Sequence, residues 1–297
     1  MTTYRPYSYR AIGSPAPARR EDSHDGSFVL GAVRDDIRQT LRTAWIDPAL
    51  EAGAAYPAIF TAAWSAVRPN VGKSFLGLAK ALRADAVEAV RERLEPSDLV
   101  PRLQWQLAEE ELHRIGDSAR SAYLVAPKLQ VVVHAFHRML RRERIPGTGR
   151  EESPVRRGIP EWQRWMGFQT VSGDSAAMLE DAAEALATPA TPGVLRLFGR
   201  WPIALAALWV DLAPRAASSE WGPASARLRR IVLAGVNTLP HPMELQWGAL
   251  KARGVSDDER IALLDLIAAF DSALAAQTLA AAFAWVAFRS PEVGAEG

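Results

Sequence analysis

The chain contains no cysteine, and this absence excludes several kinds of chemistry. Disulfides, thiolate nucleophiles and zinc–thiolate sites all need cysteine side chains, and their absence fits a reducing compartment. Net charge is also nearly absent, because 35 Lys and Arg stand against 34 Asp and Glu. Such a chain has no global field to attract nucleic acid or an acidic membrane. We therefore expect a cytoplasmic protein whose partner is a small-molecule ligand or substrate, with no nucleic acid and no membrane.

The sequence motifs of several common enzyme classes are missing too. There is no G-x-G-x-x-G, G-x-x-x-x-G-K-[ST], G-x-S-x-G or H-E-x-x-H, so nucleotide, acyl-hydrolase and zincin functions have no support. Glu110 and His113 have the E-x-x-H spacing of di-iron bundles, but that class needs a second such motif and two further glutamates. His134 and His137 could share one helix face, yet a metal would need a third ligand. We predict neither a metal nor another cofactor.

Long alternating runs typical of strands are nearly absent, whereas helical patterns recur from about residue 30 to residue 290. This distribution predicts an all-α fold. Asp47-Pro48 has the pattern of a helix cap followed by proline at the first helical position, and we expect that helix to carry Tyr56, Phe60 and Trp64.

The C-terminal part of the chain carries the most apolar stretch, from Ile261 to Phe288. The residues Ser256-Asp257-Asp258-Glu259 form a capping box that should open a long final helix there. Acidic side chains interrupt the stretch, which a membrane span would rarely tolerate. We therefore predict a buried core helix.

An internal repeat is the strongest organisational signal. When residues 36–89 are compared with residues 181–234 without a gap, 14 of the 54 pairs are identical, and tryptophan and proline are among them. A second, shorter match between the two halves pairs Leu103-Gln104-Trp105 with Leu245-Gln246-Trp247. The segment between the two copies is rich in Gly, Pro and charge, as expected of a linker.

The repeat predicts two tandem helical units packed as an intramolecular pseudo-dimer. We divide the chain into a mobile N-terminal arm (1–29), repeat 1 (30–144), a linker (145–173), repeat 2 (174–290) and a tail (291–297). Two similar units would pack about a pseudo-twofold axis, as the subunits of a homodimer do, and a cleft between them could be asymmetric. The sequence also leaves open a homodimer of the whole chain.

Four segments in order and in register suggest a family: VRDDIRQTLRTAW, AYPAIFTAAW, YLVAPKLQVV and LFGRWPIAL. Together with the repeat, they resemble the group I 2-haloacid dehalogenases over roughly residues 30 to 285. The resemblance implies an all-helical pseudo-dimer with a pocket between the repeats. It also implies hydrolytic removal of halide from a 2-haloacid by direct attack of water, which an aspartate activates and an asparagine holds.

The polar residues that the resemblance requires are substituted in this chain. Trp45 matches a tryptophan lining the family's pocket, but the phenylalanine three residues later is replaced by Pro48. The water-holding asparagine is replaced by Ala126, and the water-activating aspartate by Val194. Valine cannot accept a proton and alanine cannot orient a water molecule, so the family's usual base step cannot use these positions.

Asp47 is the carboxylate nearest to the inferred pocket and is our candidate for a relocated catalytic base, although helix capping before Pro48 is the commoner use of such an aspartate. Arg196 and Arg200, one helical turn apart, could bind a substrate carboxylate, or could be ordinary solvated arginines. The remaining candidates for the substrate pocket are residues from both halves: Trp45, Pro48, Tyr123, Ala126, Gly193 and Val194.

Three functions stay open, because function depends on the site rather than on the fold. The first is a hydrolase-like protein that handles a small carboxylic substrate between the repeats without the family's own Asp and Asn. The second is a non-catalytic or differently catalytic binder of a hydrophobic small molecule. The third is a protein-interaction module with a vestigial pocket.

Overall fold

The computed structural model describes residues 25–153 and 155–289. The predicted all-α class is confirmed over these residues, which contain twelve α-helices and no strand. The only β-type pairing among them is an isolated bridge between Ile145 and Met243. The helices are α1 (Asp25–Leu41), α2 (Pro48–Gly53), α3 (Pro57–Val67), α4 (Lys73–Ala89), α5 (Val100–Leu103), α6 (Glu109–Leu140), α7 (Asp174–Ala185), α8 (Gly193–Arg196), α9 (Pro202–Ala216), α10 (Trp221–Val236), α11 (Trp247–Ala252) and α12 (Asp257–Ala287).

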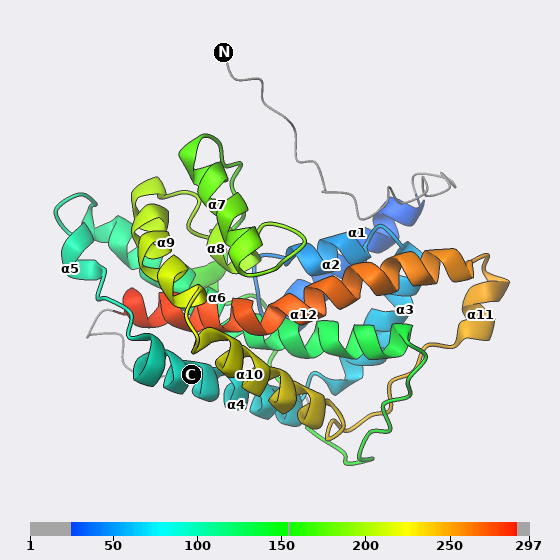
Figure 1. The fold of residues 1–297 in the computed structure, drawn as a ribbon. Helices are drawn as coiled ribbons and strands as arrows, with labels where there is room; N and C mark the ends of the chain where they lie inside the picture. The colour runs from blue at the N-terminus through cyan, green and yellow to red at the C-terminus, as the bar shows by residue number, and fades with distance from the viewer. Residues whose placement is uncertain (1–24, 154, 290–297) are drawn as a thin grey trace.

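Two long helices, α6 and α12, form the centre of the molecule and pack along each other (Figure 1). Helices α4 and α10 contact each other and both central helices. The shorter helices lie towards the two ends, with α5 and α9 at one end and α3 and α11 at the other (Figure 1). One hydrophobic core therefore runs through both halves of the chain.

The helix that opens at Asp47-Pro48 is shorter than the sequence predicts. It ends at Gly53, and a separate helix, α3, begins at Pro57 and carries Phe60 and Trp64. Pro57 has no N–H with which to continue a helix. A Cβ at residue 53 would lie 2.9 Å from the Phe60 ring, so glycine allows the turn to fold tightly onto that ring.

The capping prediction for the last helix is confirmed. Ser256 accepts a hydrogen bond from the Glu259 N–H, and the Glu259 side chain accepts one from the Ser256 N–H at 2.8 Å. Of the described helices, α12 alone is long and apolar enough to cross a membrane, but 72% of its most apolar window is buried inside the fold. This burial agrees with the predicted core helix.

Helix starts in the two halves keep the spacing of the sequence repeat. Helices α2 and α8 begin at residues 48 and 193, and α3 and α9 begin at residues 57 and 202, so both pairs are 145 positions apart. Helix α1 begins at Asp25, inside the predicted arm, while the rest of that arm (1–24) and the predicted tail (291–297) lie outside the described residues. The described residues of the predicted linker are irregular apart from a 3-10 turn at Glu161–Gln163 and the isolated bridge.

Candidate functional site

The connection between α1 and α2 holds a buried carboxylate. Asp47 is the N-cap of α2, and its Oδ1 accepts a hydrogen bond from the Ala49 N–H at 2.9 Å. Only 1% of Asp47 is exposed, and its Oδ2 has no hydrogen-bond partner among the described residues. Burial raises the pKa of this carboxyl to about 6, against opposing contributions from the Ala49 hydrogen bond and the positive charge of Arg196. Asp47 therefore combines the predicted capping role with one free, desolvated oxygen.

Gly193, the first residue of α8, lies directly against this carboxylate. A Cβ at residue 193 would be 2.5 Å from Asp47 Oδ2, 3.0 Å from Pro48 Cδ and 3.3 Å from the Trp45 ring. Real Cβ atoms do not approach other atoms so closely, so the contact requires glycine. The structure thus brings together four of the predicted site residues, from both halves of the chain.

Aromatic rings and one arginine continue the site beyond Asp47. Trp45 is buried, donates from Nε1 to Ser121 Oγ on α6 at 3.0 Å, and has its ring centroid 5.6 Å from that of Phe168. The guanidinium carbon of Arg196 lies 4.3 Å from the centroid of the same Phe168 ring, and its Nε has no partner among the described residues. Phe168 therefore lies against both Trp45 and Arg196, in the segment predicted to be a linker.

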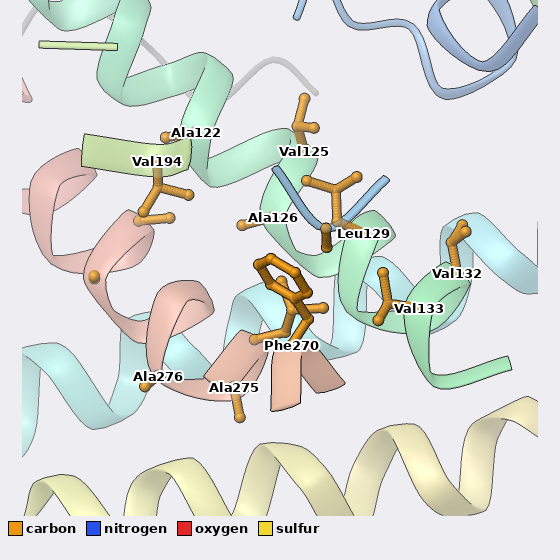
Figure 2. Close-up of a cluster of buried hydrophobic side chains, with 14 of the residues drawn as sticks. Ala122, Val125, Ala126, Leu129, Val132, Val133, Val194, Phe270, Ala275 and Ala276 are labelled. Carbon is orange, nitrogen blue, oxygen red and sulfur yellow. The ribbon is translucent and has the colours of Figure 1, made fainter. Parts of the chain in front are cut away.

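The two positions where the resemblance implies an asparagine and an aspartate lie in apolar packing. Ala126 and Val194 are each 1% exposed. Figure 2 shows Val194 from α8 and Ala126 from α6 in one cluster of buried hydrophobic side chains, together with Leu129 and Phe270. Ala126 and Val194 therefore contribute no polar side chain that could hold a water molecule.

Two predicted pocket residues have their observed contacts elsewhere. Tyr123 stacks on Trp285 of α12, with ring centroids 5.5 Å apart, and the guanidinium carbon of Arg83 on α4 lies 5.8 Å from the centroid of the Tyr123 ring. Arg200 is exposed and lies over Trp165, 5.5 Å from the ring centroid. These contacts favour a packing role for both residues, so neither enters the candidate site.

A buried lysine fixes the loop that carries Asp47. Lys128 of α6 donates from Nζ to the carbonyl oxygen of Leu41, the last residue of α1, at 2.8 Å. Burial, together with the smaller contributions of the Arg83 and Arg42 charges, lowers the pKa of Lys128 to about 8. A cation at the C-terminal end of a helix is favourable and satisfies a free carbonyl. We assign Lys128 the role of a positioning residue for the start of this loop.

Sequence reasoning missed Ser121, Phe168 and Lys128. Lys128 is part of the quoted segment YLVAPKLQVV, but its partner is a carbonyl group 87 positions away in the chain. Phe168 lies in an irregular segment that carries no periodic signal. No local pattern could have identified these contacts.

The histidine patterns assemble into packing contacts. Glu110 forms an ion pair with Arg114 at 2.7 Å, one turn along the same helix. His134 and His137 both donate from Nδ1 to Asp271 of α12, at 3.1 and 2.7 Å. Burial acts to raise the pKa of Asp271, but these hydrogen bonds outweigh it and the pKa falls below its ordinary value. The two histidines therefore join the central helices.

Comparison with known proteins identifies the fold. The sequence matches no protein-family profile and none of the curated proteins. The solved structures with a similar fold include D-2-haloacid dehalogenases. A complex with L-LA has a TM-score of 0.81 and 19% identity, covering 97% of this chain and 100% of the other. A mutant complex with D-2-CPA has a TM-score of 0.80 and 20% identity, covering 94% and 97%. The chain therefore has the dehalogenase fold over nearly its whole length.

Proposed function

We propose that this chain is a hydrolase-like protein that binds a small organic carboxylic acid beside Asp47, with the Asp47 carboxylate as the group that accepts a proton from a substrate or water molecule bound there. The observation that carries the proposal is the free Oδ2 of a buried carboxylate whose pKa is about 6. A general base works best when its pKa lies near the operating pH. Carboxyls perturbed by desolvation in this way are concentrated at functional sites.

Arg196 supports the choice of an acidic substrate. Its charge acts on Asp47, and its buried Nε has no partner among the described residues. A guanidinium group can bind a carboxylate through charge-assisted hydrogen bonds. In this arrangement Arg196 holds the acid, while the rings of Trp45 and Phe168 exclude bulk water. The structures with the same fold include complexes with L-LA and D-2-CPA, which supports a small ligand.

We also propose that the two halves are related by an approximate twofold axis that passes through this site. On such an axis a residue contacts its own equivalent. Pro48 and Gly193 are 145 positions apart and in contact. Gln130 accepts a hydrogen bond from Thr278 at 2.9 Å, and these two residues are 148 positions apart, as are the starts of α6 and α12.

The site is asymmetric even though the halves are similar. At the 145-residue offset the equivalent of Asp47 is Pro192, so only one half supplies a carboxylate. Dehalogenation through positions 126 and 194 is not part of the proposal, because Ala126 and Val194 offer no polar atom and lie in an apolar cluster.

Ligand binding tests the proposal. Lactate, propionate or 2-chloropropionate should raise the unfolding temperature of the purified protein, because a ligand that binds the native state stabilises it by mass action. The stabilisation should be lost in Arg196→Met and kept in Arg200→Met, a matched arginine that lies outside the site. If none of these acids stabilises the protein, or if Arg196→Met responds as the wild type does, the proposal is wrong.

Halide release tests the chemistry separately. We expect the wild-type protein to release little or no halide from either enantiomer of 2-chloropropionate. Rapid release that is abolished in Asp47→Asn would reject this expectation and would identify Asp47 as the base of a working dehalogenase. Rapid release that survives in Asp47→Asn would reject Asp47 as the base.

The apolar cluster around Ala126 and Val194 favours a second candidate, a binder of a hydrophobic small molecule. A thermal-shift screen separates the two, because the second candidate predicts stabilisation by apolar compounds that does not depend on Arg196. A third candidate, an interaction module with a vestigial pocket, predicts no stabilisation by either class.

A further inference from the structure

A groove on the surface lies away from the Asp47 site, between α3 and α11. Its volume is about 730 Å³, in the range of small-molecule sites. Figure 1 shows these two helices at the end of the molecule opposite α5 and α9. The lining is mostly small or aliphatic: Val29, Pro57, Ala58, Thr61, Ala62, Ser65, Ala66, Glu244, Leu245, Gln246, Ala249, Leu250 and Arg253.

Small side chains on one face of α3 leave room for the groove. Ala58, Ala62 and Ala66 follow one another at intervals of one turn and all line it. At the same offset of 145 positions, α9 carries Ile203, Ala207 and Asp211. Bulkier residues therefore replace two of the three alanines in the second half.

The charges at the groove favour an anionic ligand group. Arg253 belongs to the lining and is exposed, and its guanidinium group forms no hydrogen bond or ion pair with any described residue, although its backbone N–H donates to Leu250. The one acid in the lining, Glu244, already has a cationic partner in Arg144 at 3.8 Å. The groove thus combines apolar walls with one uncompensated positive charge.

We propose that this groove binds a straight-chain aliphatic carboxylate, with the alkyl chain along α3 and the carboxylate at Arg253. The face from Pro57 to Ala66 is about 14 Å long at 1.5 Å per residue. An extended alkyl chain of roughly ten carbons has a similar length, because each carbon–carbon bond of about 1.5 Å adds slightly less than its own length along the chain axis. Alanine and leucine walls suit methylene groups, and a guanidinium suits the carboxylate.

Isothermal titration of the full chain with sodium decanoate tests this proposal. We expect one site per chain, with affinity falling at least tenfold from decanoate to hexanoate because four methylene groups leave the apolar walls. Ala62→Phe should fill the groove and abolish binding. Ala207→Phe is the matched control, because it places the same ring at the equivalent position of α9, and it should bind as the wild type does. Arg253→Ala should weaken binding several-fold.

Several outcomes would overturn the proposal. These are the absence of decanoate binding, binding that Ala62→Phe leaves intact, and equal affinity for hexanoate and decanoate. A dimer in sedimentation that Ala62→Phe makes monomeric would assign the groove to a second copy of the chain. Binding that appears only after deletion of residues 1–24 would assign it to that segment. Residue 47 lies outside the groove, so the Asp47→Asn variant should bind decanoate as tightly as the wild type does. This result is expected whether or not the proposed function at Asp47 is correct.

Discussion

Replacement of Asp47 by asparagine should remove a pH-dependent loss of stability that the buried carboxylate causes. The pKa of the Asp47 carboxyl is 3.8 when the side chain is solvated, as in the unfolded chain, and about 6 in the folded protein. The unfolded state therefore loses its proton first, and the folded state is destabilised relative to it as the pH rises from about 4 to about 6. At 1.36 kcal/mol per pKa unit the full effect is about 3 kcal/mol, reached above pH 6. Asparagine cannot ionise but can still accept the Ala49 hydrogen bond.

Urea unfolding at pH 5 and pH 7.5, followed by far-UV circular dichroism, measures this effect. The quantity to compare is the free energy of unfolding of the wild type minus that of Asp47→Asn. Between these two pH values this difference should change by roughly half of the 3 kcal/mol, so that Asp47→Asn gains stability relative to the wild type at pH 7.5. In an Arg196→Met background the change should be larger, because loss of the positive charge raises the pKa of Asp47 further.

The same measurement can refute the reasoning. If the difference between wild type and Asp47→Asn stays constant from pH 5 to pH 7.5, the carboxylate ionises as it would in water. The free oxygen would then be solvated or paired in solution, and the assignment of Asp47 as a base would be rejected.

Three other experiments probe the packing of the site and of the central helices. Gly193→Ala should destabilise the protein by about 2 kcal/mol or more, because its Cβ would lie 2.5 Å from a carboxylate oxygen; Gly222→Ala, which meets nothing within 4 Å, should be neutral or slightly stabilising in thermal unfolding. A double-mutant cycle of Trp45→Phe and Ser121→Ala should give a coupling energy of about 1 kcal/mol, and additivity would mean that the 3.0 Å hydrogen bond contributes nothing. Asp271→Ala should lower the unfolding temperature at pH 7, and this loss should shrink as the pH falls through the lowered folded pKa; an unchanged loss at low pH would contradict the assigned hydrogen bonds.

The helical architecture could be predicted from local patterns. The proline at position 48 after Asp47 and the capping box at Ser256 both mark observed helix starts. These signals depend on residues within one turn, so they can be recognised without knowledge of the fold. Phe60 and Trp64 were predicted on the helix that opens at Pro48, although Pro57 lacks the N–H that a continuing helix needs. The turn at Gly53 against the Phe60 ring is visible only in the structure.

The candidate site could be predicted only in part. The resemblance and the repeat pointed to Trp45, Asp47 and Gly193, and the structure brings them into contact. Tyr123 matched the same expectation, but its ring packs against Trp285 instead. Which face of a long helix meets which neighbour is decided by the packing of the whole chain.

The sequence by itself determined that this protein is all-helical, where several helices begin, and that no carboxylate or amide stands at positions 126 and 194. Tertiary structure alone decided that Asp47 would be buried with one oxygen unpaired, because its desolvation comes from Gly193 and other residues far away in the chain. Local hydrogen bonds can be inferred from neighbouring residues, whereas exclusion of water requires every surrounding element to be in place.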